Sequence, residues 1–214
     1  MIYYHKGVEV IIMAKIFNWT EGINQEELKI VIETLNDDGI IIFPTDTVYG
    51  IGCNCFSEKA IQKLFKIKER NYKKPINVLT NNIEKIQKVA KNISIKQEEL
   101  INKYMPGALT MILDKKEGVP DLLTSNLETI GVRIPNNKIA LEILKNFDLP
   151  LATTSVNISG NNPGIEIEDF IEEFTNKVDI IIDGGKSQIG IASTIISINN
   201  DNNINILRQG SIKI

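Results

Sequence analysis

Apolar residues along the chain alternate between a helical spacing and short unbroken runs. In the segment Asn24–Gly39 they occupy positions 28, 31, 32 and 35, which is the spacing of one helix face. The segment closes on Gly39, a typical helix-stop residue. The run "IIIF" follows without a polar position and ends at Pro44, so it predicts a buried strand.

The same helical spacing recurs later in the chain. Ser57 is a good N-cap for the helix "EKAIQKLFKIK", whose apolar positions 60, 61, 64 and 65 form one stripe. The remaining helices are predicted, in chain order, at Ile83–Ala90, at Ile95–Tyr104 before Pro106, near Asp121, at Ile139–Asn146 and at Ile167–Thr175.

Short apolar runs bounded by turn residues predict the other strands. They are the extended piece Cys53–Cys55, "INVLT", "ALTMIL", "IGVRIP", "PLATTSVNISG", "VDIIID", "STIISI" and "INILR". This mixed order predicts a single α/β domain with a twisted, partly parallel and partly antiparallel sheet. We assign residues 1–20 to an N-terminal extension, with Met13 as an alternative start, and residues 21–214 to the domain.

Composition narrows the class of protein. With 214 residues, 43% hydrophobic and 24% charged, the chain matches a soluble globular protein of one large domain. Its net charge of −3 argues against a general polyanion binder, so any nucleotide or nucleic-acid contact must come from a local basic patch. There is neither a membrane-length apolar run nor a signal-peptide pattern, so we expect a cytoplasmic location and no membrane partner.

Histidine and cysteine usage excludes several chemistries. The sole histidine, His5, lies in the extension, which rules out a histidine base, a Ser-His-Asp triad and a multi-histidine metal site. Cys53 and Cys55 have no second pair to complete a zinc site, so we expect two small, semi-buried thiols.

The stretch "KIKERNYKK" at 66–74 holds five basic residues and one acid. On a continuous helix Lys68 and Arg70 would diverge by about 200°. They can converge on one ligand only if the helix ends near Lys68 and the chain turns. The alternative is a solvated helix end.

Polar side chains also recur at alternate strand positions, which share one face of a sheet. In "TTSVNISG" these are Thr153, Ser155 and Asn157, which line either a pocket or a solvent-facing edge. Thr129 and Arg133 alternate similarly, and the arginine either grips a carboxylate through two hydrogen bonds or forms a surface salt bridge.

Ser193, Thr194 and Arg208 lie near strand ends late in the chain. With the stretches above, they supply hydroxyls, amides and fixed cations, but no titrating base. Such a set suits phosphoryl or nucleotidyl transfer, in which positioning and charge neutralisation dominate.

Six motifs, in order, resemble the YrdC-type L-threonylcarbamoyladenylate synthase family in its short, single-domain bacterial form. They run from about Gly39 to Gly210 and read "FPTDTVYGIG", "KIKER…KKPINVL", "MPGALTMIL", "GVRIP", "TTSVNISG" and "STIISI…ILRQG". The resemblance implies an α/β twisted sheet flanked by helices, with a large, positively lined cavity. Departures are Asn71 after K-x-R, "SVN" for "SAN" and "LRQG" for "LRPG".

The resemblance also implies an activity. A nucleotidyltransferase of this family converts L-threonine, bicarbonate or CO₂ and ATP with Mg²⁺ into threonylcarbamoyl-AMP and pyrophosphate, for threonylcarbamoyladenosine (t6A37) modification of tRNA. The product would pass to a tRNA threonylcarbamoyltransferase complex, and tRNA contact is not required for this step.

Site residues follow from the motifs. The resemblance implies that Lys68 and Arg70 are catalytic, that Mg²⁺ is held through the ATP phosphates without protein ligands, and that ATP is bound by Lys68, Arg70, Thr129, Ser155, Asn157 and Arg208. It implies threonine contacts from Thr45, Arg133, Thr153 and Ser193. "PTDT" would form the floor of the threonine pocket, with Tyr49 or Ile51 shaping it. Asp46 would contact the threonine ammonium or tie the loop to nearby amides.

Two alternatives compete with this interpretation. A non-catalytic RNA-binding or ribosome-maturation factor could use the same basic cavity, but the acidic balance and the scarcity of aromatic residues near Lys66–Lys74 count against it. A carbamoyl-transferring module of a hydrogenase-maturation protein would belong to a much longer chain with zinc-finger-like cysteine pairs, which this sequence lacks.

Overall fold

The computed structural model describes residues 2–5, 8–11, 13–158, 160–199 and 201–214. Its strands are β1 (Ile2–His5), β2 (Val8–Ile11), β3 (Lys15–Asn18), β4 (Ile41–Phe43), β5 (Gly50–Asn54), β6 (Asn77–Leu79), β7 (Ala90–Lys91), β8 (Leu109–Lys115), β9 (Thr129–Arg133), β10 (Leu151–Ser155), β11 (Ile180–Asp183), β12 (Thr194–Ile198) and β13 (Ile204–Arg208). Within the described residues, β1 and β2 pair with each other and the rest form one sheet of 11 strands.

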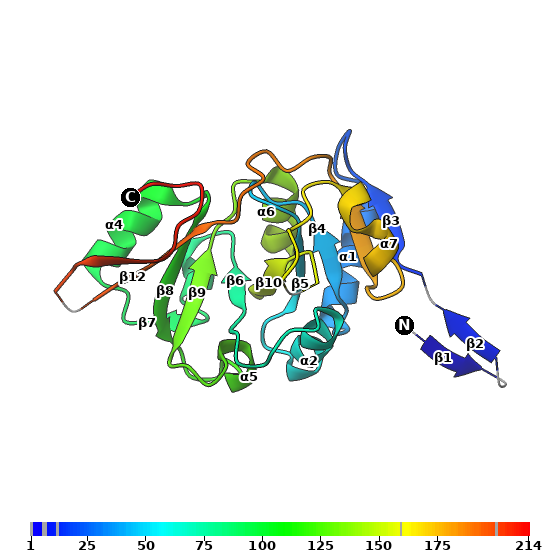
Figure 1. Cartoon of the computed structure of the whole chain (residues 1–214), viewed down its shortest axis with the longest axis horizontal. Coiled ribbons are helices and arrows are strands. Elements are labelled where there is room, and N and C mark those ends of the chain that lie inside the picture. Colours follow the sequence, from blue (N-terminus) through cyan, green and yellow to red (C-terminus); the bar gives the residue numbers. More distant parts are fainter. Residues whose placement is uncertain (1, 6–7, 12, 159, 200) are drawn as a thin grey trace.

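The central sheet has the order β13-β12-β8-β9-β6-β10-β5-β4-β11-β3, with β7 paired to β8 (Figure 1). Strand β11 pairs in parallel with β3 and β4, β6 with β9, and β8 with β12. The remaining neighbours are antiparallel. The predicted mixed α/β sheet is therefore confirmed.

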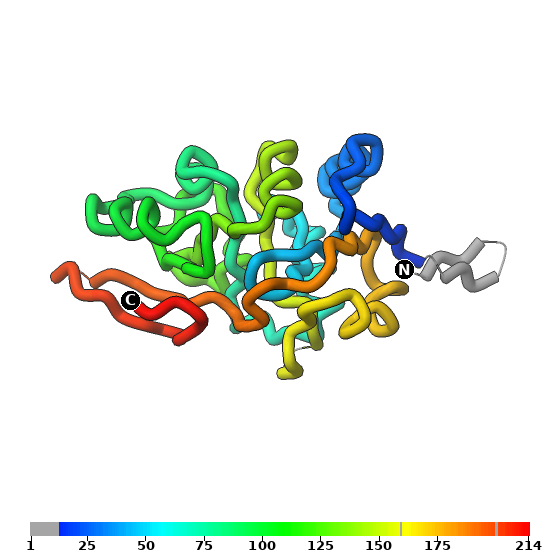
Figure 2. Tube along the Cα trace, turned by 90° about the horizontal axis from the view of Figure 1, so that it is seen from above, coloured from blue at the N-terminus to red at the C-terminus, as the bar shows by residue number. Residues whose placement is uncertain are grey.

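Helices cover both faces of the sheet. They are α1 (Gln25–Asn36), α2 (Glu58–Ile67), α3 (Ile83–Ile86), α4 (Ile95–Tyr104), α5 (Asp121–Thr124), α6 (Lys138–Asn146) and α7 (Ile171–Phe174), with a 3₁₀ turn at Ile167–Asp169. Figure 2 shows α1, α4 and α6 along one side of the sheet and the segment that carries α7 on the other. No helix of the described chain has both the length and the apolar character needed to cross a membrane.

Two hydrophobic clusters explain why "IIIF" has no polar position. Ile40 and Ile42 pack into one cluster with helix α2, whereas Ile41 and Phe43 pack into the other with α1 and α6. All four are at most 1% exposed. A strand that is buried on both faces reads as a continuous apolar run rather than an alternating one.

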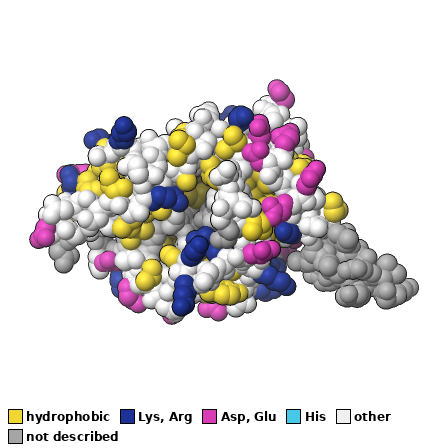
Figure 3. Space-filling model, viewed as in Figure 1, with side chains coloured by type: hydrophobic (Ala, Val, Ile, Leu, Met, Phe, Trp, Pro, Cys, Tyr) yellow, Lys and Arg dark blue, Asp and Glu magenta, His cyan; other side chains and the backbone are white. Residues whose placement is uncertain are grey.

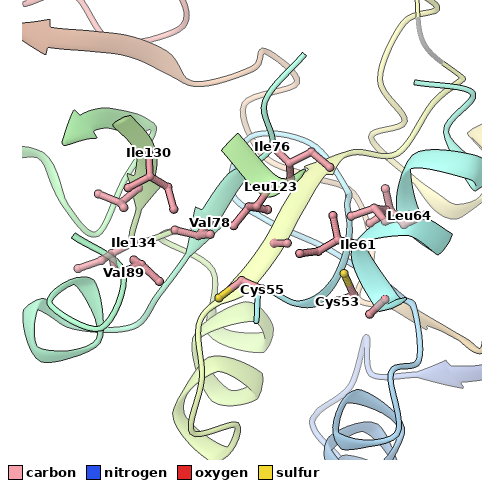
Figure 4. Packing of buried hydrophobic residues seen from close by; sticks show 14 of the residues in the cluster. Cys53, Cys55, Ile61, Leu64, Ile76, Val78, Val89, Leu123, Ile130 and Ile134 are labelled. Atoms are coloured by element: carbon pink, nitrogen blue, oxygen red, sulfur yellow. The ribbon is translucent and has the colours of Figure 1, made fainter. Parts of the chain in front are cut away.

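The two cysteines belong to the first of these clusters, in which Figure 4 shows Cys53 near Ile61 of α2. Both are free and buried, and burial raises the pKa of each thiol. They act as small core residues, but both are fully buried rather than semi-buried as expected. The side chain of His5 lies outside the described part of the structure.

Several predicted boundaries differ from the observed ones. Helix α1 ends at Asn36, and Asp38 rather than Gly39 adopts the left-handed conformation, with φ 60°. Helix α3 is shorter than predicted because Ala90 begins β7, which pairs with β8. The helix predicted at 167–175 is divided into a 3₁₀ turn and α7.

Strand β3 comes from the segment that the sequence analysis assigned to the extension. It pairs in register with β11 and forms one edge of the sheet. Of its four residues only Phe17 is buried. An edge strand with a single buried side chain carries little alternating pattern, which is why the sequence did not reveal it.

Candidate active site

One cavity of about 490 Å³ opens where several strands of the central sheet end. Its wall combines the "PTDT" loop after β4, the loop after α2, strands β8 and β10, and the segment 192–208. The lining includes Arg70, Lys73, Lys74, Arg133 and Arg208 and, among the described residues, no carboxylate. On the face shown in Figure 3, several Lys and Arg side chains lie near the middle of the molecule.

The cavity gathers most of the residues predicted for the site. The predicted residues in its wall are Thr45, Arg70, Arg133, Thr153, Ser155, Ser193 and Arg208. Lys68, Thr129 and Asn157 do not line it. Of the two residues considered for shaping the pocket floor, Tyr49 lines the cavity, whereas Ile51 is buried away from it.

The chain turns directly after α2, between Lys68 and Arg70. The helix ends at Ile67 with Lys68 as its C-cap, and Glu69 takes a positive φ of 47°. The chain then folds back, so that Arg70 N donates to Phe65 O at 3.0 Å. The sequence analysis required the helix to end near Lys68 and the chain to turn there, and the structure shows both.

Lys68 is buried, and its ammonium is fully occupied by protein oxygens. Nζ donates to Ser155 O at 2.5 Å and to Asn157 Oδ1 at 2.8 Å, and it also donates to Asn157 O. Three acceptors use all three ammonium protons. Lys68 thus fixes the chain at the end of β10, directly behind the cavity wall.

Burial has a second effect on Lys68. It lowers the pKa of this ammonium to about 7, and the positive charge of Arg70 acts in the same direction. The sequence analysis treated Lys68 as a fixed cation in a protein with no titrating group at the site. A lowered pKa was not part of that interpretation, because the sequence does not show how deeply Lys68 is buried.

The "TTSVN" segment supplies one polar strip of the wall. Thr153 and Ser155 face the cavity from β10. Strand β10 ends at Ser155, so Asn157 is oriented by hydrogen bonds rather than by strand alternation. Ser155 Oγ donates to Asn157 Oδ1 at 2.7 Å, and Asn157 Nδ2 donates to Asn161 O at 2.8 Å.

Arg133 lies at the end of β9 and is anchored on three sides. Nε donates to Gly107 O at 2.9 Å, Nη1 to Thr47 Oγ1 at 2.8 Å and Nη2 to Asp46 Oδ1 at 2.5 Å. Burial lowers the pKa of Arg133, and the charge of Asp46 counteracts this effect. Arg133 is therefore a buried, paired cation rather than part of a surface salt bridge.

The "PTDT" loop is held by its own hydroxyls. Thr45 Oγ1 donates its single proton to Val48 O at 2.6 Å. Thr47 Oγ1, 3.0 Å from Thr45 Oγ1, must then donate to it, which leaves the Thr47 oxygen to accept from Arg133. Of the two roles considered for Asp46, the structure shows the second, since its Oδ1 accepts from Asn136 N at 3.0 Å.

Sequence reasoning did not single out Thr110, which pairs with Ser193 in the cavity wall. The two hydroxyl oxygens are 2.8 Å apart, and Arg208 Nη2 lies 3.2 Å from Ser193 Oγ. Thr110 and Ile112 alternate on β8 and both line the cavity. The only sequence signal for Thr110 was one hydroxyl within an apolar strand, which is too common to point to a site.

Gly131 allows a second missed residue, Asn77, to reach the wall. A Cβ at Gly131 would lie 2.1 Å from Asn77 Oδ1, so only glycine permits the approach.

Thr129 lies four residues before Arg133 on the same face of β9, roughly 13 Å away along the strand. This distance explains why Thr129 is outside the cavity wall.

The donors of the cavity suit anionic and zwitterionic ligands. Guanidinium groups and hydroxyls can bind phosphate and carboxylate oxygens directly. The described residues contain no group of three or more His, Cys, Asp or Glu that could hold a metal ion.

Comparison with known proteins gives the site a family context. The sequence model of the Sua5/YciO/YrdC family, described as "Telomere recombination", matches residues 33–210. The threonylcarbamoyl-AMP synthase of Pyrococcus abyssi is 35% identical over 186 residues, which cover 87% of this chain and 55% of that protein. A provisionally assigned threonylcarbamoyl-AMP synthase of Methanocaldococcus jannaschii is 39% identical, with 90% of this chain and 91% of that protein covered.

The fold has a solved counterpart. The crystal structure of Pyrococcus abyssi Sua5 complexed with L-threonine matches with a TM-score of 0.88 at 34% identity, covering 91% of this chain and 57% of that one. The chain thus spans little more than half the length of the Pyrococcus abyssi relative. Residues 33–210 include every residue of the cavity wall.

Proposed function

Because the chain belongs to the Sua5/YciO/YrdC family, we propose that it is a threonylcarbamoyl-AMP synthase. This nucleotidyltransferase would convert L-threonine, bicarbonate and ATP into threonylcarbamoyl-AMP and pyrophosphate. One observation carries the proposal: a single cavity contains Arg133, suited to a carboxylate, together with Arg70 and Arg208, suited to phosphates. The names of the relatives agree with this assignment.

In this proposal the ATP side of the cavity comprises Arg70, Ser155 and Arg208, with Lys68 and Asn157 directly behind it. Arg70 is held by its own loop, since Nε donates to Lys74 O and Nη2 to Pro75 O. A cation that is already oriented neutralises the developing charge of the leaving pyrophosphate without reorganisation. Lys68 and Arg70 are the proposed catalytic residues, and Mg²⁺ would enter as part of the ATP substrate.

The threonine side comprises Thr45, Arg133, Thr153 and Ser193. The threonine-bound state of Pyrococcus abyssi Sua5 supports a threonine site in this fold. Arg133 still has one N–H on each terminal nitrogen beyond the bonds described above, and two such donors can bind both oxygens of one carboxylate. Thr129 would act only through an extended nucleotide, because it lies outside the wall.

The chemistry we propose needs no protein carboxylate or histidine. The neutral amine of threonine forms an N–C bond with bicarbonate, and water leaves, which gives a carbamate anion. A carbamate oxygen then forms a bond to the α-phosphorus of ATP while the bond to the β-phosphate oxygen breaks and pyrophosphate departs. The enzyme's task is to hold two anions close together, which the immobile cations of the cavity make favourable.

The fate of the product is part of the same proposal. Threonylcarbamoyl-AMP would be consumed in the t6A37 modification of tRNA, by hand-off to a tRNA threonylcarbamoyltransferase complex in the cytoplasm. Synthesis itself would require no tRNA, since the cavity would hold all three small substrates.

Pyrophosphate release tests the proposal. The purified protein is incubated with ATP and Mg²⁺, and threonine and bicarbonate are omitted in turn from bicarbonate-depleted buffer. We expect release only with both present, and mass spectrometry should detect threonylcarbamoyl-AMP. Release that is independent of threonine, or salt-sensitive RNA binding without any reaction, would reject the assignment in favour of another nucleotide reaction or of an RNA-binding factor.

A further inference from the structure

We propose that Asp46 is a positioning residue for threonine: it acts through Arg133 and does not touch the substrate. This inference rests on the proposed function, because it assigns Arg133 to the threonine carboxylate. Asp46 is 4% exposed and does not line the cavity, whereas Arg133 does. Asp46 and Arg133 form an ion pair of 2.5 Å. Among the ion pairs of the described residues, it is the one in which both side chains are less than 10% exposed.

The geometry of Arg133 shows what Asp46 contributes. The planar guanidinium is held at Nε by a backbone carbonyl, at Nη1 by Thr47 and at Nη2 by Asp46. Three fixed points define the plane and rotation of the group, so the directions of its remaining donors are fixed as well. Without Asp46, Nη2 would lose its partner and the buried charge its counterion.

Asp46 also joins two separate segments of the site. Its Oδ1 accepts from Asn136 N, just beyond β9, and its backbone oxygen accepts from Ile189 N at 3.0 Å. The neighbouring Thr47 O accepts from Gly190 N at 2.8 Å. Segment 189–190 leads directly to Ser193, so Asp46 and Thr47 set the spacing between Arg133 and that hydroxyl.

The second carboxylate oxygen points to an internal role. Asp46 Oδ2 has less than 1 Å² of exposed surface and no hydrogen-bond partner among the described residues. An oxygen enclosed in this way is out of reach of a ligand in the cavity. Asp46 therefore contributes negative charge to Arg133, and the pair presents a net neutral environment to a zwitterionic amino acid.

The test is a double-mutant cycle on threonine binding, measured by calorimetry without ATP. Asp46→Asn keeps an acceptor for Arg133 and Asn136 but removes the charge. We expect threonine affinity to fall about tenfold to a hundredfold, as for a lost bond to a charged group. In the Arg133→Gln background the same change should alter the affinity less than about twofold, because the group through which Asp46 acts is already absent.

Matched controls separate positioning from general damage. Asp179 is a partly buried aspartate away from the cavity, and its Oδ2 accepts a hydrogen bond from Ile40 N at 2.7 Å. Asp179→Asn should therefore leave the threonine affinity unchanged. The KM for ATP should be unchanged in Asp46→Asn. If that variant does not fold, Thr47→Val removes the Nη1 acceptor instead, and Thr47→Ser, which keeps the hydroxyl, should restore binding.

The outcomes are distinguishable. Equal losses in both backgrounds would mean that Asp46 contacts the substrate directly, and an unchanged affinity in Asp46→Asn would mean that it has no role. Either result overturns the inference while the proposed function stands. If the unaltered protein binds no threonine and releases no pyrophosphate, the proposed function fails first, and the inference fails with it.

Discussion

Lys68 Nζ lies 2.8 Å from Asn157 Oδ1, although 89 positions separate the two residues in the sequence. This bond joins the loop after α2 to the end of β10 and places a buried ammonium behind the proposed phosphate site. In the proposed function Lys68 would have two tasks: it would supply charge, and it would hold the segment that carries Ser155.

Replacement of Lys68 tests both tasks. We expect Lys68→Ala to lower kcat/KM for ATP by about 10²–10³-fold, the loss typical of one oriented electrostatic group. The variant should also unfold more easily, by about 1–3 kcal/mol, because buried carbonyls lose their donor. Pyrophosphate release and urea unfolding measure the two effects. Lys63→Ala, on the same helix but outside the cavity wall, is the control and should retain activity.

The pH dependence of ATP binding follows from the pKa of Lys68, which burial lowers to about 7. Above this pH the free protein loses the ammonium charge, whereas bound triphosphate favours its retention. The KM for ATP should therefore rise as the pH increases above 7, by up to about tenfold per pH unit. Steady-state kinetics between pH 6 and 9 would show it. A flat profile would contradict a role for the Lys68 charge.

The same pKa shift predicts a change in stability. The pKa of Lys68 is lower in the folded protein than its ordinary value of 10.5. Between about pH 7 and 10.5 the unfolded chain therefore carries a proton that the folded chain lacks, so the contribution of Lys68 to the free energy of unfolding increases with pH. Urea titrations of the unaltered protein and of Lys68→Met at pH 7 and 9 should differ in this direction.

Loss of Arg133 should be costly for folding as well as for binding. Arg133→Gln leaves the Asp46 carboxylate buried without its counterion, and we expect destabilisation by about 3–5 kcal/mol. The double variant with Asp46→Asn should recover part of this loss, because no uncompensated charge remains. Urea unfolding of both single variants and the double variant measures the coupling. Strictly additive losses would show that the ion pair does not couple the two residues.

The contact at Gly131 makes a steric prediction. Gly131→Ala would place a methyl group 2.1 Å from Asn77 Oδ1, so one of them must move. We expect a loss of about 1–3 kcal/mol in the free energy of unfolding, as for other overpacked sites. In the Asn77→Ala background the clash is removed, and the same substitution should cost clearly less. An equal cost in both backgrounds would place the strain elsewhere.

Local signals predicted much of the fold. Helix α4 has the predicted bounds because Pro106 stops it and its apolar residues keep a helical spacing. Ser57 caps α2 as predicted, with its side chain accepting from Ala60 N. These features depend on neighbours within a few residues, which a sequence displays directly.

The features that sequence could not reveal depend on distant partners. Whether Lys68 is a fixed or a titrating cation is decided by its burial against Ser155 and Asn157. The role of Asp46 is decided by Arg133, 87 residues later. Strand β7 is only two residues long and exists because β8 lies beside it. Such relationships arise only when the sheet has assembled.

The cavity wall draws on residues from Thr45 to Arg208, and β12, which follows Ser193, is held between β8 and the late strand β13. A ribosome that has synthesised the first 190 residues has therefore made Arg133 but not the hydroxyl and guanidinium that face it. The cavity wall is incomplete until the β12–β13 hairpin has been made and β12 has paired with β8. A product that stops before Ser193 would therefore lack part of the proposed threonine and nucleotide sites.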